Sequence, residues 1–326
     1  MKRNLLLFVV LTLMLPLGLR SQYTAITNYH KYFASAVYNG MEVAVIRTYN
    51  SQEKQYYIAV GVNDIQTYLI PAEKIRPITQ KWDELVTHYS NTPYIKAIRF
   101  AKKQSFSLQD AGIQHGYSKN KGIALTIDLC PSHKTLDRVI FTSIAEAFKN
   151  LKTPKPIGVS ITGKFLNTHP EDIEWLKGLV KSGAINIVWI NHTYNHRYNP
   201  KLPLKENFLL EPQTNLDTEI LLLEQRLLEK EIVCSAFFRF PGLVSDRTLV
   251  EQVTNYGLIP IGSDAWLAKG QSAQNGDIVL IHGNGNEPVG VTDFLALLKK
   301  KQNAILKKEW LLYDLREAID EEFKNE

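Results

Sequence analysis

The sequence predicts an α/β protein in which parallel strands alternate with helices, preceded by a smaller α+β unit. From Gly122 onward, short β-branched apolar runs alternate with segments of helical length, which is the pattern of parallel βα units. Before that point, two apolar runs flank a polar turn at residues 50–54, and a third run and a helical segment follow. At 326 residues and 44% hydrophobic content, the chain can form one large domain or two ordinary ones.

Residues 1–21 have the pattern of a secretory signal peptide. Basic residues precede an apolar stretch from Leu5 to Leu17, and residues 18–21 resemble a cleavage region that ends near Ser21 or Gln22. The apolar stretch is shorter than a helix needs to span a bilayer, which favours removal over a retained anchor. We therefore expect an exported protein, periplasmic or extracellular, with no stable membrane span after cleavage.

Residues 22–112 are expected to form a small α+β accessory domain. The segments that suggest it are strands at 43–46, 56–60 and 67–70 and a helix at 82–89. No group of residues in this domain suggests chemistry. It either helps to dock a polymer or partner, or is a structural cap on the larger domain.

Residues 113–326 are expected to form the larger domain. Its first strand closes at residues 125–129. The other expected strands are 157–161, 185–190, 236–240, 259–262 and 278–282, and the expected helices are 139–151, 172–182, 216–230 and 248–256.

Polar residues follow successive strands of this domain. The five fragments, in chain order, are Leu125–Ser132, Ser160–Gly163, His192–His196, Arg239–Gly242 and Leu280–His282. In barrel folds the carboxyl ends of the strands form the catalytic face. His192 and His196 are four residues apart, so a helical turn would direct both imidazoles at one metal ion, although such a pair alone is weak support for a metal site.

Taken in order, these fragments resemble the polysaccharide deacetylase family. These are the family-four carbohydrate esterases, with the nodulation-type chitooligosaccharide deacetylase homology domain, which use a metal to remove N- or O-acetyl groups from glycans. The resemblance covers roughly residues 113 to 320 and includes the segment from Ile157 to His196. It implies a distorted seven-stranded β/α barrel of the deacetylase type.

The resemblance also implies a role for each matching residue. Asp128 matches the general base, Arg239 the arginine that orients this base, and His282 the general acid. His192 and His196 match metal ligands, for zinc in preference to cobalt or nickel. The residues expected at the substrate are Pro241, Trp266, Leu280 and Asp264. Taken singly, Asp128, Arg239 and His282 each also have a purely structural interpretation.

One position departs from the family pattern. Leu129 stands where the family has a metal-binding aspartate, and Cys130 stands where it has glycine. Leucine cannot bind a cation, so the third ligand must be Asp128, Cys130, His133 or a water molecule. A Cys130 thiolate would be a good zinc ligand on the same side of the strand as Asp128, or Cys130 is a small apolar filler. Cys130 and Cys234 are expected to be free thiols, because they lie toward opposite ends of parallel strands.

The predicted function is an exported metal-dependent hydrolase of carbon–nitrogen bonds other than peptide bonds, acting on an acetylated polysaccharide such as peptidoglycan or an exopolysaccharide. The alternative is a catalytically impaired family member that binds glycan without hydrolysis, because the metal-ligand position is Leu129. The net charge of +5 is modest and the lysines are scattered, which argues against nucleic acid as a partner. The oligomeric state is left open.

Overall fold

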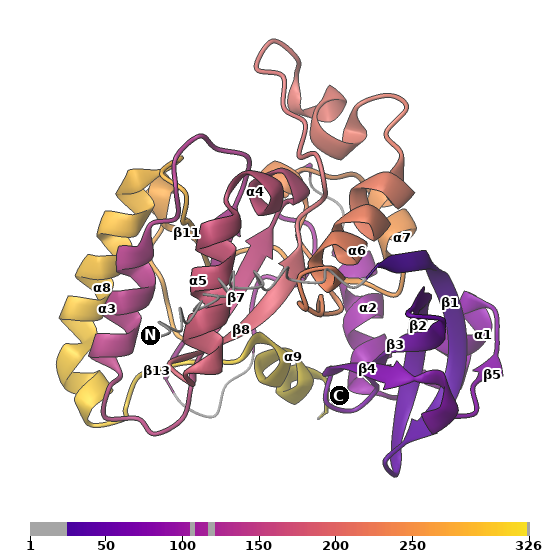
Figure 1. Ribbon diagram of the computed structural model, residues 1–326. Coiled ribbons are helices and arrows are strands. Elements are labelled where there is room, and N and C mark those ends of the chain that lie inside the picture. Colours follow the sequence, from indigo (N-terminus) through magenta and orange to yellow (C-terminus); the bar gives the residue numbers. More distant parts are fainter. Residues whose placement is uncertain (1–24, 105–107, 117–120, 325–326) are drawn as a thin grey trace, which may run out of the picture.

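The computed structural model describes residues 25–104, 108–116 and 121–324, and the predicted signal peptide lies outside these ranges. Two sheets organise the chain (Figure 1). A five-stranded antiparallel sheet has the order β4-β3-β2-β1-β5. A larger parallel sheet has the order β10-β9-β8-β7-β6-β12-β11, with β13 pairing to β6 outside this path.

The antiparallel sheet and two helices form the N-terminal unit. Its elements are β1 (Ile26–Tyr38), β2 (Met41–Ser51), β3 (Lys54–Gly61), β4 (Thr67–Pro71), β5 (Ile78–Thr79), α1 (Trp82–His88) and α2 (Pro93–Lys103). The strands and the helix expected from the sequence are present. The expectation omitted β1, because register shifts at two places in this strand disrupt its two-residue periodicity.

The larger unit follows the predicted alternation of strands and helices. The strands are β6 (Gly122–Leu129), β7 (Lys155–Ile161), β8 (Ile185–Asn191), β9 (Phe237–Phe238), β10 (Ile259–Pro260), β11 (Ala265–Trp266), β12 (Ile278–His282) and β13 (Leu311–Leu312). The helices are α3 (Arg138–Ala147), α4 (Gly163–Thr168), α5 (Pro170–Lys181), α6 (Leu222–Leu228), α7 (Arg247–Thr254), α8 (Pro288–Leu306) and α9 (Leu315–Lys324). Sequence reasoning omitted α8, and it treated the π-helical turn Asp217–Leu221 and α6 as one continuous helix.

The curled parallel sheet confirms the expected α/β architecture of the deacetylase type. A segment that precedes β6 crosses the gap between β10 and β12. Ile113 accepts a hydrogen bond from the Gly262 amide (2.8 Å), and Gln114 accepts one from the Ile278 amide (3.1 Å). The proposed domain boundary at residue 112 therefore falls within a segment that is bonded to the barrel strands.

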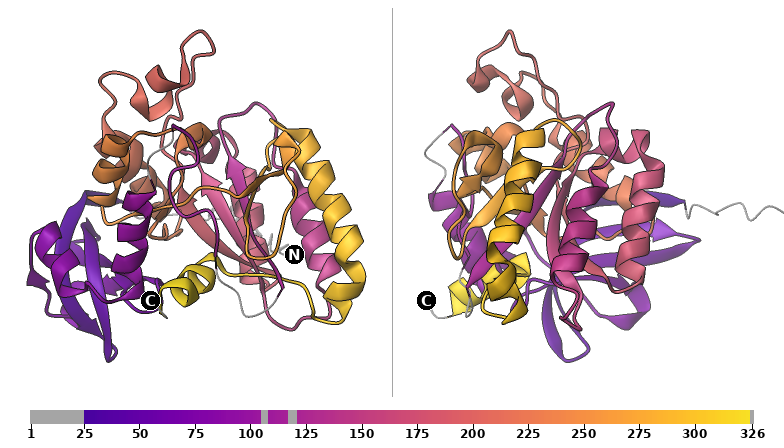
Figure 2. Two further views of the ribbon diagram at one scale, coloured as in Figure 1. Left: turned by 180° about the vertical axis from the view of Figure 1, so that it is seen from behind. Right: turned by 90° about the vertical axis from the view of Figure 1, so that its left-hand side faces the viewer.

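Two large apolar cores stabilise the fold, and the second of them joins the two units. The first lies between the parallel sheet and helices α3, α5 and α8, which cover one side of the sheet (Figure 2). The second joins the antiparallel sheet and α2 to the other side of the barrel, through residues such as Ile46, Tyr94, Val188 and Phe237. Continuous apolar packing of this kind ties the N-terminal unit closely to the barrel.

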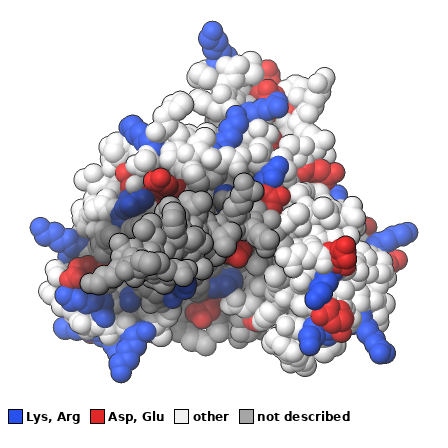
Figure 3. Space-filling model, viewed as in Figure 1, with Lys and Arg blue, Asp and Glu red and all other residues white. Residues whose placement is uncertain are grey.

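The surface carries charges of both signs. In Figure 3 the lysines and arginines are scattered among acidic residues over the visible face, without a continuous field of one sign. None of the helices that the structure describes is long and apolar enough to cross a membrane.

Candidate active site

The predicted site residues gather at the carboxyl ends of the parallel strands. β12 pairs with β6 so that His282 lies directly beside Asp128 in register. His192 follows β8 and Arg239 follows β9, the next two strands beyond β7. Because parallel strands end at one edge of a sheet, four sequence-distant motifs reach a single location.

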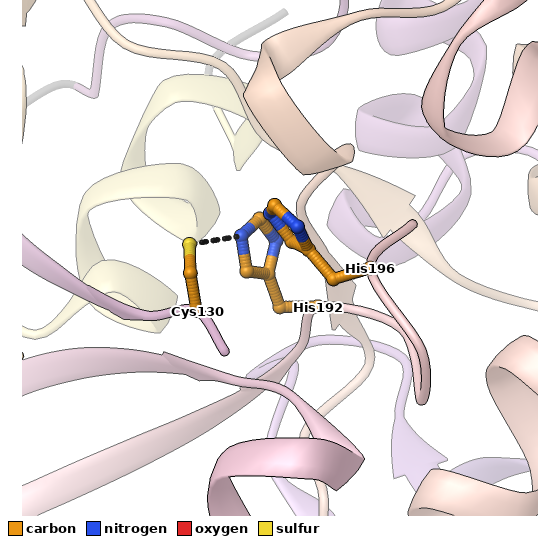
Figure 4. A group of neighbouring side chains, drawn as sticks. All are labelled: Cys130, His192 and His196. Carbon is orange, nitrogen blue, oxygen red and sulfur yellow. Dashed lines mark hydrogen bonds between the residues drawn. The ribbon is translucent and has the colours of Figure 1, made fainter. Parts of the chain in front are cut away.

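Cys130, His192 and His196 form a group that can hold a metal ion (Figure 4). One donor atom from each residue lies within 4.8 Å of the other two. The Cys130 Sγ is 3.5 Å from the His192 Nε2. The His196 Nε2 is buried and has no hydrogen-bond partner among the described residues. An unpartnered buried imidazole nitrogen beside a thiol and a second imidazole is a donor set that fits zinc.

The Nδ1 nitrogen of His192 orients the imidazole ring. Nδ1 lies 2.9 Å from the Arg239 carbonyl oxygen, so donation there leaves Nε2 free to act as a ligand. Burial alone would lower the pKa of His192, but Asp128 and Cys130 raise it above its ordinary value. The Asp128 Oδ2 is 3.6 Å from the His192 Nε2.

The two histidines converge without the helical turn that their spacing predicts, so that expectation was wrong. Thr193 and His196 have left-handed backbone angles (φ 70° and 48°), and the segment between them is irregular. The Tyr194 amide donates to the Glu219 carbonyl oxygen (2.8 Å) instead of to a carbonyl one turn earlier. The ring centroids of His192 and His196 still lie 4.9 Å apart. Their convergence therefore depends on a loop held by its neighbours.

The structure places Leu129 and Cys130 on opposite sides of the strand end. Leu129 is fully buried in the core between the sheet and the helices. Cys130 emerges on the side of Asp128, as strand alternation requires, and contacts the histidines. Burial alone would raise the pKa of the Cys130 thiol, but the surrounding histidines, His196 foremost, lower it well below its ordinary value. His133, the other side-chain candidate, is exposed and outside the group of possible ligands.

Asp128 and Arg239 form a buried ion pair. The Arg239 Nη1 donates to the Asp128 Oδ1 (3.1 Å) and to the Thr126 Oγ1 (2.7 Å), and Nη2 donates to the Gly262 carbonyl oxygen (2.8 Å). Burial alone would raise the pKa of Asp128, but Arg239 and then His192 lower it below its ordinary value. The carboxylate is thus ionised and held in one orientation beside the metal-binding group.

His282 is paired with an acidic residue that sequence reasoning missed. Its Nδ1 lies 2.8 Å from the Glu287 Oε2, which also accepts a hydrogen bond from the Trp266 Nε1 (2.7 Å). Burial alone would lower the pKa of His282, but Cys130 and Glu287 raise it well above its ordinary value. The available signal was an acidic residue immediately before Pro288, at the start of a helix only five residues after His282.

The residues expected at the substrate fall in different places. Trp266 lines the main cavity, and its ring centroid lies 5.7 Å from that of His282. Pro241 lines a smaller adjoining pocket of about 120 Å³, and Leu280 is buried beneath Trp266. Asp264 does not join the charges around Arg239 and His282: its carboxylate is 2.8 Å from the His115 Nδ1. Glu287, and not Asp264, is the acidic residue beside His282.

A cavity of about 750 Å³ opens over Cys130, His196 and His282. The segment after His196 projects above the strand ends (Figure 1) and contributes Tyr198 and Phe208, whose rings stack with centroids 5.1 Å apart. The size of the cavity and its mixture of aromatic and polar lining residues suit a small polar ligand or one unit of a polymer.

No family model matches the chain. Among solved structures, it is similar to a family 4 carbohydrate esterase from Bacillus anthracis, with 16% identity, a TM-score of 0.47, and coverage of 68% of this chain and 90% of that one. The structural neighbours are family 4 carbohydrate esterases. PdaA of Bacillus subtilis is 15% identical (TM-score 0.42; 67% and 95% covered). The Bacillus anthracis family 4 pseudoenzyme BA3943 is also 15% identical (TM-score 0.44; 70% and 82% covered).

Proposed function

We propose that this chain is an exported, metal-dependent hydrolase that removes N-acetyl or O-acetyl groups from a polysaccharide such as peptidoglycan or an exopolysaccharide. The observation that carries the proposal is the convergence at one end of the barrel of a group that can hold a metal, an ion-paired carboxylate and a histidine paired with Glu287, with a cavity above them. Hydrolysis of an acetyl amide or ester needs a polarised carbonyl, an activated water and a proton for the leaving group. Each requirement has a residue in this chain that can meet it.

Cys130, His192 and His196 would hold the metal, most suitably zinc. When bound, such an ion supplies Lewis-acid polarisation and lowers the pKa of an adjacent water. Asp128, whose pKa is lowered by Arg239, would accept the proton of the attacking water. Arg239 has no exposed surface, so it would fix the carboxylate through Nη1 without contacting substrate.

His282 is the group that would protonate the leaving amine or alcohol. Cys130 and Glu287 raise the pKa of His282, which favours the protonated imidazole that a general acid needs. Trp266 holds Glu287 in place by a hydrogen bond and forms part of the cavity wall.

The second candidate function is glycan binding without hydrolysis. The observation that favours it is the fully buried Leu129, which cannot donate an oxygen ligand where the family has an aspartate. In that case the cavity and its aromatic side chains would retain a sugar, and the polar groups would serve only as hydrogen-bond partners.

Metal analysis and acetate release together test the proposal. Purified protein without residues 1–21 is dialysed, analysed for metal, and assayed for acetate release from N-acetylated and O-acetylated glycans, alongside His192→Ala and Asp128→Asn. We expect near-stoichiometric metal that is lost in His192→Ala, and an Asp128→Asn protein that keeps metal but releases no acetate. Absence of metal after incubation with zinc, cobalt or nickel would contradict the proposal. Metal without acetate release, but with glycan binding, would favour the second candidate.

A further inference from the structure

The N-terminal unit contributes a buried arginine to its contact with the barrel. β2 carries a bulge at Ile46, since Val45 pairs with Ala59 but Arg47 pairs with the next residue of β3, Ile58. The extra residue returns Arg47 to the side of the sheet that packs on the barrel, the side that also carries Ile46 and Ile58. Without the bulge, two-residue alternation would direct Arg47 to the opposite side. Arg47 is 1% exposed.

Arg47 neutralises a carboxylate on α6. Its Nε donates to the Glu224 Oε2 (2.7 Å) and its Nη2 donates to the Glu224 Oε1 (3.1 Å). The hydroxyl of Tyr29, on β1, also donates to the Glu224 Oε2 (2.7 Å). The remaining Nη1 donates to the Tyr256 carbonyl oxygen, on the barrel. Glu224 is 3% exposed, so most of its compensation comes from the N-terminal unit.

Glu224 in turn contacts the residue that precedes the first metal-binding histidine. The Asn191 Nδ2 donates to the Glu224 Oε1 (3.3 Å) and to the Ile220 carbonyl oxygen (3.1 Å). The Asn191 Oδ1 accepts a hydrogen bond from the amide of Thr193 (3.0 Å), which has a left-handed backbone conformation, as His196 does. Asn191 is fully buried, and its side chain links Glu224 to the backbone on the far side of His192.

We propose that Arg47 is a positioning residue for the metal site, acting through Glu224 and Asn191 on the loop that carries His192 and His196. The N-terminal unit is then part of the scaffold of the site and is not a detachable polymer-binding module. The inference rests on the proposed metal-dependent function. Its physical basis is that a buried carboxylate deprived of its arginine recruits other donors, and the Asn191 amide is the nearest one that the metal loop supplies.

The chain offers a control near the start of β8, the strand that ends at Asn191. Arg316 donates to Asp314 (Nε to Oδ1, 2.8 Å) and to Gln66 of the N-terminal unit, and Asp314 accepts from Asn186 near the start of β8 (3.3 Å). Each arginine holds a carboxylate through a bidentate fork and also contacts the other unit, so Arg47→Lys and Arg316→Lys both replace such a fork by a point charge. Only the Arg47–Glu224 pair contacts a residue next to the loop that carries His192 and His196.

The test compares zinc affinity in the purified chain without residues 1–21 and in these two variants of it, by competition with a chromogenic chelator. The visible spectrum of the cobalt form and the melting temperature are measured alongside. We expect Arg47→Lys to weaken zinc binding by about tenfold or more and to change the cobalt spectrum, as outer partners of metal ligands do. The zinc affinity of Arg316→Lys should stay within about twofold of that of the unaltered chain, while its melting temperature falls by an amount comparable to that in Arg47→Lys.

The outcomes separate the two proposals. An unaltered chain that binds no metal refutes the proposed function itself. An unaltered chain that binds zinc, with Arg47→Lys equal to Arg316→Lys in affinity and spectrum, overturns the positioning role alone. Should Arg47→Lys not fold, Tyr29→Phe takes its place, since it removes a single hydrogen bond to Glu224. It is expected to weaken zinc binding by about threefold, and an unchanged affinity overturns the inference.

Discussion

Replacement of Cys130 by serine is the most direct perturbation of the proposed metal site. The thiol sulfur lies 3.5 Å from the His192 Nε2, and it completes a group of three donor atoms within 4.8 Å of one another. Serine is nearly isosteric but is a poor ligand for zinc, because its hydroxyl does not ionise near neutral pH. The substitution therefore removes one ligand while leaving the packing almost unchanged.

The expected magnitude follows from the strength of zinc–ligand sets. Zinc sites with four protein ligands bind with roughly 10–16 kcal/mol, or about 3 kcal/mol per ligand when divided evenly. Loss of one ligand then weakens the affinity by about 100-fold. The surrounding histidines lower the pKa of the Cys130 thiol, which favours the thiolate form that zinc binds.

The assay is zinc competition against a chromogenic chelator, with cobalt absorption as a second readout. A thiolate ligand gives cobalt a near-ultraviolet charge-transfer band, which should be present in the unaltered chain and absent in Cys130→Ser. Cys234→Ser is the control, because Cys234 is the other free, buried cysteine and lies in the core with its sulfur 3.6 Å from the Trp189 carbonyl oxygen. Equal zinc affinity in Cys130→Ser and the unaltered chain would refute the ligand role and leave Cys130 as a small apolar filler.

Three further predictions concern the departure from the family motif, the general acid and the backbone. Leu129→Asp should lower the free energy of unfolding by about 3 kcal/mol or more without raising metal affinity, because this side chain lies in the apolar core; denaturant unfolding and metal titration check both parts. Glu287→Gln removes a carboxylate that raises the pKa of His282, so the pKa must fall and the alkaline limb of the rate profile should move to lower pH; an unmoved limb would exclude His282 as the acid. Gly122→Ala should lower the free energy of unfolding by about 2 kcal/mol or more, because φ is +150° and an added Cβ would overlap a backbone carbonyl of β13. Gly178→Ala, on the open face of α5, should raise the free energy of unfolding by about 0.5–1 kcal/mol. Thermal unfolding of the two variants measures both effects.

Much of the fold could be predicted because its signals are local. β12 was expected at residues 278–282 and is found there, and β7 and β8 differ from expectation by at most two residues. Parallel strands covered on both faces are continuous apolar runs, which stand out from the helices between them. The helix α8 was missed although it is 19 residues long, because its apolar residues extend around much of its circumference and its start follows a glycine-rich loop.

The candidate site was predictable in its members but less so in its connections. Asp128, Arg239, His192, His196 and His282 were placed by motif order, and they do converge. Glu287 and the π-helical turn that holds the histidine loop were not foreseen. Their contacts join residues that no periodic pattern relates: Glu219, for example, accepts hydrogen bonds from the Asn195 amide (2.8 Å) and side chain (2.7 Å), 24 positions away.

The sequence by itself determined the alternation of strands and helices, the order of the polar motifs and the absence of a carboxylate at Leu129, because each is a property of neighbouring residues. The tertiary structure alone decided that Cys130 faces the histidines, that Glu287 and not Asp264 pairs with His282, and that Arg47 pairs with Glu224 on α6. These contacts depend on a bulge, on left-handed loop residues and on packing between two units, and such features arise from the balance of many weak interactions across the whole chain.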